Sequence, residues 1–229
     1  MREISYEEQT VRSGNPLARF AHRTRMRMGI DLVAELCAKS GTVLDFGAGP
    51  GLFLHLLGEV RPDITLVGHD PYMAPTFPEL KYAESLDSVA SHSVDVLTAF
   101  EVCEHLYDEE VDTLLKDASR ILDRNGALVI SVPIMYGLAI VPKVSNWMIR
   151  SRSLRSEYRP SDVLKAMVGM RVSRPQNPRT THKGFDFREL REVVRERFHI
   201  DAVHLSPVRH APWWLNSQCF MICRPKARG

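Results

Sequence analysis

The segment VLDFGAGPGLFLHLL, residues 43–57, constrains the fold more than any other part of the chain. It places Gly47, Gly49 and Gly51 between two apolar runs. Glycine loses more backbone freedom on folding than any other residue, so this spacing indicates a turn that needs positive φ angles or a close approach to the backbone. The run before the turn is typical of a buried strand, and the run after it has helical spacing. Such a strand, turn and helix form a nucleotide-type binding site at a helix N-terminus.

The residues around the glycines narrow the class of ligand. A dinucleotide fingerprint needs glycine at position 52, where this chain has Leu52, and the Gly-Lys-Ser/Thr of a phosphate-binding P-loop is absent. Asp45 instead lies at the end of the strand, directly before the turn. A carboxylate there would repel a pyrophosphate but suits an ammonium or a sulfonium group. The turn therefore favours a ligand that carries one of these cations.

Strand-like runs alternate with helical patterns along most of the chain. This rhythm predicts a largely parallel, Rossmann-like α/β sheet covered on both faces, within a single domain over residues 1–229. The length and the 44% of hydrophobic residues suit one such domain with an insertion. We expect helices within 17–38, 52–60, 101–122 and 185–198, and strands within 42–47, 64–70, 80–85, 94–99, 127–133, 199–207 and 217–226.

The rhythm breaks between residues 135 and 182, which we predict to be a basic helical cap inserted between the fifth and sixth strands. From Lys143 to Lys183 there are ten Lys or Arg residues and two acids, a local charge of +8. The whole chain carries +2, so the remainder is acidic at −6. Ligands of such sheets bind outside the carboxyl ends of the strands, so an insertion at this position overhangs the site.

The pattern Asp45-x-Gly47-x-Gly49-x-Gly51 resembles the first motif of class I S-adenosylmethionine-dependent methyltransferases. The stretches DVLTAFEVCEHL and ILDRNGALVISVP resemble the following motifs of the broad ubiquinone-type O-methyltransferase group. HKGFDFRELREVVRERF resembles the late helix of this group, and PWWLNSQCFMICRPK resembles uncharacterised bacterial members that include proteins of surface-polysaccharide or lipid pathways. The resemblance implies an antiparallel last strand and S-adenosylmethionine as the cofactor.

The same resemblance implies cofactor-binding residues. Asp70, at the end of the second strand, would bind both ribose hydroxyls, for which a carboxylate is well suited. Tyr72 would stack on the adenine, and Arg25 or Arg23 would pair with the methionine carboxylate. Asp45, the three glycines, the backbone at Phe46, and Phe100 complete the predicted cofactor site. The side chain of Phe46 is expected to lie in the core, and a surface role for Tyr72 and the two arginines stays open.

The candidate catalytic residues lie in FEVCEHL. On a helix Glu101, Glu104 and His105 would face the same way, at positions i, i+3 and i+4. Two interpretations are open: His105 is a general base for a hydroxyl acceptor, or the three side chains hold a divalent cation that orients a catechol or diol. The cation interpretation resembles both the ubiquinone-type enzymes and the plant-type small-RNA 2′-O-methyltransferases, which have an EVxEH stretch and a further histidine. Here His182 would supply that histidine.

The basic cap has several interpretations. We rank a lid over an anionic or lipid-linked acceptor first, peripheral contact with an anionic membrane second and RNA binding third, beside the simpler case of a solvated cap. No series of aromatic residues for base stacking accompanies the charge, so nucleic acid is a less favoured partner. The preferred function is methyl transfer to an oxygen of a small molecule, a sugar or a lipid-linked acceptor. The alternatives are a metal-dependent RNA ribose 2′-O-methyltransferase and a non-catalytic adenosylmethionine-binding subunit.

The cysteines and the N-terminal sequence bear on the compartment. Cys37, Cys103, Cys219 and Cys223 show no paired zinc spacing and are interpreted as buried thiols in a reducing environment. The N-terminal residues contain no apolar signal-peptide core, and no apolar run is long enough to span a bilayer. We therefore expect a cytoplasmic protein, with peripheral membrane contact through the cap as an open alternative.

Overall fold

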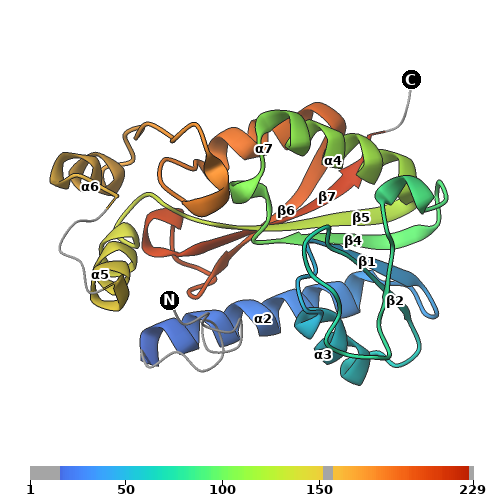
Figure 1. The fold of residues 1–229 in the computed structure, drawn as a ribbon. Coiled ribbons are helices and arrows are strands. Elements are labelled where there is room, and N and C mark those ends of the chain that lie inside the picture. Colours follow the sequence, from blue (N-terminus) through green and yellow to red (C-terminus); the bar gives the residue numbers. More distant parts are fainter. Residues whose placement is uncertain (1–15, 152–156, 227–229) are drawn as a thin grey trace.

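The computed structural model describes residues 16–151 and 157–226, which form a seven-stranded sheet flanked by helices (Figure 1). The strand order is β3-β2-β1-β4-β5-β7-β6. Strands β1 to β5 pair in parallel, whereas β7 is antiparallel to both of its neighbours. The mostly parallel Rossmann-like sheet and the antiparallel last strand are thus confirmed. The strands are β1 Thr42–Phe46, β2 Thr65–His69, β3 Lys81–Tyr82, β4 Val94–Phe100, β5 Leu122–Pro133, β6 Phe198–Ser206 and β7 Gln218–Pro225.

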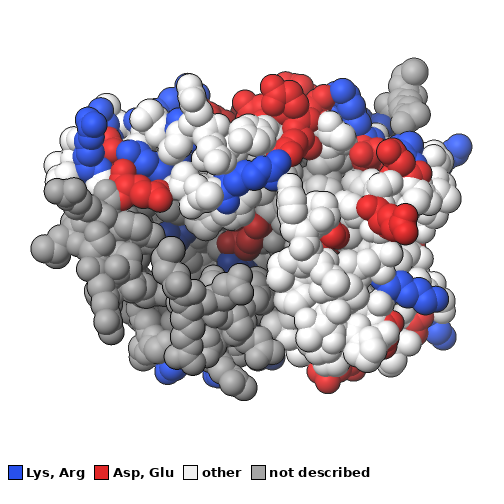
Figure 2. Space-filling model, viewed as in Figure 1, with Lys and Arg blue, Asp and Glu red and all other residues white. Residues whose placement is uncertain are grey.

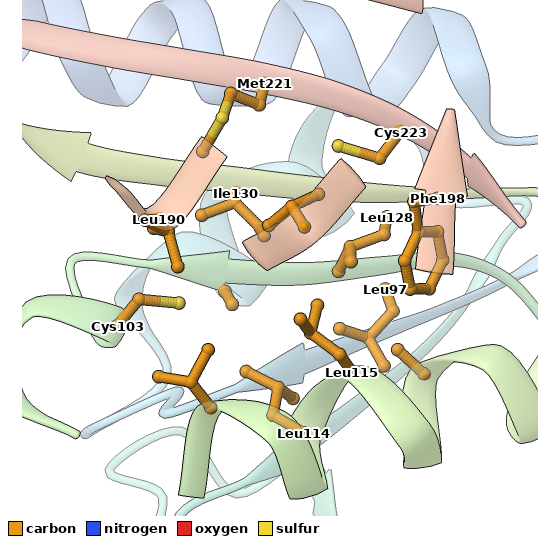
Figure 3. Packing of buried hydrophobic residues seen from close by; sticks show 14 of the residues in the cluster. Leu97, Cys103, Leu114, Leu115, Leu128, Ile130, Leu190, Phe198, Met221 and Cys223 are labelled. Atoms are coloured by element: carbon orange, nitrogen blue, oxygen red, sulfur yellow. The ribbon is translucent and has the colours of Figure 1, made fainter. Parts of the chain in front are cut away.

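Two pairs of helices cover the two faces of the sheet (Figure 1). On one face lie α2 (Pro16–Leu36) and α3 (Leu52–Val60), and on the other lie α4 (Asp108–Ile121) and α7 (Phe187–Arg197). The larger hydrophobic core packs α4 and α7 against the central strands, and it includes Leu97, Leu115 and Phe198 (Figure 3). A second core packs α2 and α3 against the opposite face. The buried central strands explain why the sequence shows continuous apolar runs instead of alternation.

Helix α4 shows how the local sequence sets an element boundary. Its first turn is acidic (Asp108, Glu109 and Glu110), and these negative charges interact favourably with the positive end of the helix dipole. The Glu110 carboxylate accepts the Tyr107 backbone N–H at 2.9 Å, satisfying one of the donors that a helix start leaves free. The helix therefore begins at Asp108, and the preceding FEVCEHL stretch lies outside it.

The segment between β5 and β7 differs from the regular strand-helix rhythm. It contains α5 (Ile140–Ser151), α6 (Pro160–Met167) and the short 3-10 turns η3 (Pro178–Thr180) and η4 (Trp213–Leu215), besides α7 and β6. Helices α5 and α6 have a small core of their own, centred on Tyr136, Ile140 and Ala166. They lie beyond the end of β5 and to one side of the sheet, at the left of Figure 1. None of the helices that the structure describes is both long and apolar enough to cross a membrane.

Several basic side chains of the cap form hydrogen bonds or ion pairs within the molecule. Lys143 Nζ donates to the backbone carbonyls of Ile134 and Ser217, at 2.9 and 2.8 Å. Lys183 forms an ion pair with Asp162 at 2.8 Å. Arg152 and Arg155 lie outside the described residues, as does the side chain of Arg150. The count of basic residues in the sequence therefore overstates how much charge the described part of the cap presents to solvent.

Candidate active site

A recess opens at the carboxyl ends of β1, β4 and β5, beside helix α2. Acidic side chains are visible within a hollow near the middle of the face shown in Figure 2. The recess contains backbone from the glycine turn, apolar surface from α2 and α3, and polar groups from the strand ends. It is lined by Arg25, Met26, Gly29, Asp45, Gly47, Ala48, Leu52, Phe53, Phe100, Glu101, Ser131 and Phe220.

Glycine is favoured at the three positions of the turn for different physical reasons. All have positive φ angles, of 76° at Gly47, 54° at Gly49 and 92° at Gly51. A Cβ atom at Gly47 would lie 2.4 Å from Val102, and one at Gly51 would lie 2.5 Å from Leu80. At Gly49 the nearest atom would be a methionine sulfur at 3.9 Å. Close packing within the chain therefore requires Gly47 and Gly51, in addition to the access to a ligand that the sequence indicated.

Replacing Gly51 by alanine is expected to lower the free energy of unfolding by about 2–3 kcal/mol, because backbone strain and the Leu80 clash add. Gly49→Ala has a φ within the left-handed helical region and only an ordinary van der Waals contact at Cβ, so it should cost only about 1 kcal/mol. Urea unfolding curves of both variants and the wild type measure the difference. Equal unfolding midpoints for the two variants would contradict the packing role of Gly51.

Asp45 is buried at the end of β1, and its Oδ1 accepts a hydrogen bond from the Thr98 hydroxyl at 2.6 Å. Burial raises the pKa of this carboxyl to about 7, while the Thr98 hydrogen bond opposes the shift and the nearby Asp70 adds to it. Ionised Asp45 lacks a cationic partner among the described residues. A ligand cation in the recess would stabilise the ionised form.

Asp70 is tied to the loops that surround it. Its Oδ2 accepts the Gly49 N–H at 2.9 Å, and its Oδ1 accepts the N–H groups of Tyr72 and Met73 at 2.9 and 3.0 Å. Because an ionised carboxylate has about four acceptor positions, one position is left on Oδ2. The carboxylate thus holds the glycine turn against the loop after β2, a role that the sequence did not indicate.

The Tyr72 ring is 77% exposed and is not part of the recess lining. The Arg179 guanidinium lies over it, 5.9 Å from the ring centroid, and also lies over Tyr107 at 5.3 Å. Arg179 forms an ion pair with Glu110 as well. The η3 turn thereby reaches across from the cap to the loop after β2, so that Tyr72 has a cation on one side of its ring.

The two predicted phenylalanines have different surroundings. Phe46 is half-buried and packs against the main core, with its ring 5.5 Å from that of His69. Phe100 lines the recess and meets Phe53 and Phe220 edge to face. The expectation of a core side chain at Phe46 agrees with this placement, and Phe100 provides apolar surface where a ligand would lie.

The prediction that Glu101, Glu104 and His105 share one helical face is wrong. Glu101 has a φ of 58°, which is uncommon for a residue other than glycine and breaks any helix at this point. Glu104 and His105 lie in a separate 3-10 turn, η2 (Cys103–His105). The strand β4 runs to Phe100 and helix α4 starts only at Asp108, so the three residues do not lie on one helix.

Glu101 points into a hydrogen-bonded group at the recess. Arg25 donates to its Oε2 at 2.6 Å, the Ser131 hydroxyl donates to its Oε1 at 3.3 Å, and the Gln218 amide donates to the same oxygen. The backbone N–H of Glu101 also donates to the Ser131 carbonyl at 2.9 Å. These contacts hold Glu101 in its unusual conformation, which is typical of a functional site.

The Arg25 guanidinium contacts two other side chains. Its guanidinium pairs with Glu101 and contacts Nδ1 of the buried His22 at 2.8 Å. Burial, followed by the charge of Arg25, lowers the pKa of His22 to about 4, so His22 is neutral and its ring nitrogen is able to accept. Arg23 is exposed and does not line the recess. Of the two arginines proposed for the methionine carboxylate, only Arg25 is therefore placed to meet a ligand there.

Glu104, His105 and His182 come together beside Glu101. The two imidazole Nε2 atoms are 3.0 Å apart, and His182 Nε2 is 3.9 Å from Oε1 of Glu104. One ligand atom from each of the three residues lies within 4.8 Å of the others. Both carboxylate oxygens of Glu104 and the Nδ1 atom of His105 are buried without a hydrogen-bond partner. Unsatisfied buried polar atoms are costly, so this cluster has the character of an incomplete site.

Burial shifts the pKa values of two members of the cluster. Burial raises the pKa of Glu104 well above its ordinary value, and the neighbouring Glu101 carboxylate raises it further. Burial also lowers the pKa of His182 to about 3, with His105, Lys143 and Arg25 adding to the effect. His182 is therefore neutral, as a metal ligand must be. Two imidazoles and one carboxylate are donor groups that would hold a divalent ion.

The cap holds the η2 turn through backbone carbonyls of that turn and of the residue that follows it. Arg174 donates to the carbonyls of Glu104 and Leu106, at 2.9 and 3.2 Å. The guanidinium also lies 5.5 Å from the centroid of the Phe185 ring, which limits its freedom. The segment that carries Arg174 and His182 therefore fixes the η2 turn from one side while it completes the cluster.

Comparison with known proteins identifies the fold family. A family model described as a methyltransferase domain matches residues 18–202, which is most of the chain. The chain belongs to this methyltransferase family. It is an S-adenosylmethionine-dependent methyltransferase of class I, and S-adenosylmethionine is its cofactor. No curated protein matches the sequence at a significant level.

Solved structures share the fold of this methyltransferase at low sequence identity. The PH0226 protein from Pyrococcus horikoshii is 15% identical, with a TM-score of 0.59 and 96% of each chain covered. Magnesium protoporphyrin IX methyltransferase from Synechocystis, solved with bound S-adenosylhomocysteine, is 13% identical with a TM-score of 0.55, over 93% of this chain and 89% of that one. The N-methyltransferase NodS from Bradyrhizobium japonicum is 14% identical with a TM-score of 0.52, over 89% and 95%. These neighbours differ in chemistry, so the fold does not select the acceptor.

Sequence reasoning missed several residues of the methyltransferase site. Ser131 and Gln218 meet Glu101 because β5 pairs with both β4 and β7, a register that the sequence does not reveal. Their signal was a polar residue within an otherwise apolar strand, since both side chains are buried. Lys143 and Arg174 were counted only as surface charge, although each binds two backbone carbonyls near the site.

Proposed function

We propose that the protein transfers the methyl group of S-adenosylmethionine to an oxygen of a small molecule, a sugar or a lipid-linked acceptor. The observation that supports this most is the cluster of the buried Glu104 with the half-buried His105 and His182 next to the cofactor recess. Its unpartnered carboxylate and imidazole atoms suit a group that binds or deprotonates a hydroxyl. The transfer is an in-line displacement, so holding the acceptor in position supplies much of the catalysis.

The recess residues have distinct roles in this proposal. Ionised Asp45 faces the cationic part of the cofactor, and one ribose hydroxyl donates to the open acceptor position on Oδ2 of Asp70. Phe100 provides apolar surface for the cofactor. Arg25 meets the methionine carboxylate while its other side stays bound to Glu101. Glu101 lines the cofactor recess and positions Arg25. We therefore assign Glu101 a role in cofactor binding and not a place among the cation ligands.

The affinity for S-adenosylmethionine is expected to rise about tenfold between about pH 6 and pH 8. The raised pKa of Asp45 means that most of this carboxyl is protonated at the lower pH, and only the ionised form attracts the cofactor's positive charge. Calorimetric titrations across this range give the affinities. Asp45→Asn should bind more weakly and with a flatter pH dependence. If wild type and Asp45→Asn showed the same pH dependence, the effect would belong to another group.

Glu104, His105 and His182 would hold a divalent cation in this protein. Two imidazoles and a carboxylate suit zinc, manganese or iron better than calcium, which prefers oxygen ligands. Such an ion, when bound, supplies a Lewis acid that lowers the pKa of an acceptor hydroxyl. The chain itself contributes a neutral His182, a backbone held by Arg174, and a buried carboxylate that excludes water from one side.

A second arrangement for the same reaction uses His105 as the general base without a cation. The 3.0 Å contact between His105 and His182 supports it, because the two ring nitrogens then share one proton and fix the tautomer of His105. His182 would act as a positioning residue in this case. The two arrangements differ in one respect that is easily measured, since only the first is stopped by a chelator.

Four basic side chains of the cap support a small or lipid-linked acceptor over RNA. RNA binding needs several exposed basic groups along the site. Lys143, Arg174, Arg179 and Lys183 are instead bound to backbone carbonyls or to acidic side chains. RNA ribose methylation therefore has less support than the sequence charge of the cap implied.

The experiment that tests the proposed function is transfer of tritium from methyl-labelled S-adenosylmethionine to separated cell-extract fractions of lipids, polar small molecules and RNA. We expect label in the lipid or small-molecule fraction, lost on chelation and restored by Mn²⁺ or Zn²⁺. Transfer that resists the chelator would support His105 as the base. Label in RNA alone would contradict the proposed acceptor. A folded protein that binds the cofactor and labels no fraction would support the binding-only alternative.

We also propose a cytoplasmic location. Cys37, Cys103, Cys219 and Cys223 are all free and buried, and burial raises the pKa of each thiol. Free buried thiols without disulfides are typical of proteins from reducing compartments.

A further inference from the structure

Exposed apolar side chains gather on helix α6 and the turn that follows it. Leu164 is 65% exposed, Val168 is 72% exposed and Met170 is 57% exposed. Leu164 and Val168 are four positions apart, so they lie on the same side of this segment. Ala166, between them in sequence, is fully buried and anchors the opposite side. The segment therefore presents its apolar side chains to solvent although it has a core of its own.

Two further segments bring exposed apolar residues to the same end of the molecule. The Gly137 N–H donates to the Ala166 carbonyl at 2.9 Å, and the Leu138 N–H donates to the Trp214 carbonyl at 2.8 Å. Leu138, Trp214 and Leu215 are each more than 40% exposed. We name this set of residues the cap patch: Leu138, Leu164, Val168, Met170, Trp214 and Leu215. Clusters of exposed apolar side chains on a soluble domain mark interaction surfaces.

The charges around the cap patch are mainly basic. Arg159 directly precedes α6 and Lys165 follows Leu164 on it, and both are exposed and form no ion pair within the described part of the chain. Arg171 follows Met170 and is 81% exposed in its side chain, paired only with the exposed Glu189. The nearby Asp162 is neutralised by Lys183. Basic side chains are visible at the α6 end of the molecule, at the upper left of Figure 2.

We propose that the cap patch docks this protein on an anionic lipid surface. Apolar side chains that enter the boundary of the bilayer, with Lys and Arg beside them, are the recognised combination for interfacial binding. Helix α6 lies at one end of the molecule in Figure 1, where its exposed apolar side is open to a planar lipid surface. Because the same cap segment continues to Arg174 and His182, a docked cap holds the active site close to the surface. Docking itself needs no cofactor, cation or acceptor.

Cosedimentation of the full chain with lipid vesicles tests the docking. The protein should pellet with vesicles of phosphatidylcholine and phosphatidylglycerol, remain in solution with phosphatidylcholine alone, and be released by salt. The double variant Leu164→Ser with Val168→Ser should lower vesicle affinity about tenfold. The matched control is Val60→Ser with Val203→Ser, which removes exposed valines from α3 and β6 and should bind vesicles like the wild type.

A second pair of variants tests the charge. Arg159→Glu with Lys165→Glu should weaken binding to anionic vesicles, whereas Lys39→Glu with Lys81→Glu changes the net charge equally at exposed positions on other elements and should not. All four variants should keep the wild-type affinity for S-adenosylmethionine, which separates failure of docking from failure of the proposed function. Absence of wild-type binding to anionic vesicles would overturn the proposal. So would a dimer in sedimentation that Leu164→Ser with Val168→Ser dissociates, because the patch would then cover a second copy.

Discussion

His182→Ala is expected to weaken the binding of a divalent cation by about 100-fold or more, because it removes one of the three ligands that the fold brings together. Glu104 and His105 would be left as a pair from a single turn, without a ligand from the cap. The paramagnetic resonance signal of free Mn²⁺, titrated against the protein, measures this affinity directly. The side chain of His182 is 39% exposed, so its removal should leave the fold intact.

The control for this variant is His210→Ala, an exposed histidine in the loop before η4. It should bind Mn²⁺ like the wild type, and both variants should keep the affinity for S-adenosylmethionine. Equal Mn²⁺ affinity in His182→Ala and the wild type would show that the cluster is not a cation site. The general-base arrangement with His105 would then be the better account of the same residues.

Asp70→Ala is expected to weaken the binding of S-adenosylmethionine by about 100-fold, measured by calorimetric titration. The change removes the acceptor of three backbone N–H groups and of the proposed ribose hydroxyl. Hydrogen bonds to a charged group are worth about 1.5–3 kcal/mol each, and loss of about 3 kcal/mol corresponds to that factor. The glycine turn would also lose the contact that holds Gly49 toward the loop after β2.

Two further variants separate these contributions. Asp70→Asn keeps one acceptor oxygen and should bind the cofactor with an intermediate affinity. Asp87→Ala removes an exposed acid from the η1 turn (Leu86–Ser88) and should have no effect. Wild-type affinity in Asp70→Ala would contradict the placement of the ribose. A loss of affinity with an unchanged unfolding midpoint would assign the effect to the ligand contact, not to the loop.

The fold was largely readable from local sequence signals. Buried parallel strands need continuous β-branched and apolar runs, and TVLDF and VDVLTA meet that need on both faces. The glycine turn was found because three costly glycines stood together, although only the structure shows that Val102 and Leu80 exclude a side chain at Gly47 and Gly51. Each of these clashes is between residues that are distant in the sequence, so a local sequence pattern does not predict them.

The geometry of the stretch from Glu101 to His105 was predicted incorrectly for a physical reason. Helical spacing assumes regular backbone angles, and Glu101 departs from them with a positive φ. That conformation is held by Arg25, Ser131 and Gln218, which come from three other elements. The structure brings one ligand atom each of Glu104, His105 and His182 within 4.8 Å of one another, whereas Glu101 lies beside this group and is bound to Arg25.

A count of basic residues in the sequence also did not show which charges of the cap are exposed. Ten basic residues between positions 143 and 183 predicted a basic surface. Lys143 is instead half-buried with its ammonium bound to backbone carbonyls, and desolvation lowers its pKa to about 8 while Glu101 opposes the shift. Ion pairs neutralise further basic side chains, such as Lys183, which pairs with Asp162. The exposed apolar residues of α6 carried no signal in the sequence, because the same spacing is typical of a buried helix face.

Methyl transfer from carbon-13 methyl-labelled S-adenosylmethionine, followed by nuclear magnetic resonance of the labelled product, tests the central claim most directly. The account predicts a methyl group bound to oxygen in a lipid-linked or small-molecule product, formed by the wild type and lost in Glu104→Gln, which retains cofactor binding. A methyl group bound to nitrogen would contradict the oxygen acceptor. Equal transfer by the wild type and Glu104→Gln would contradict the role of the cluster in catalysis.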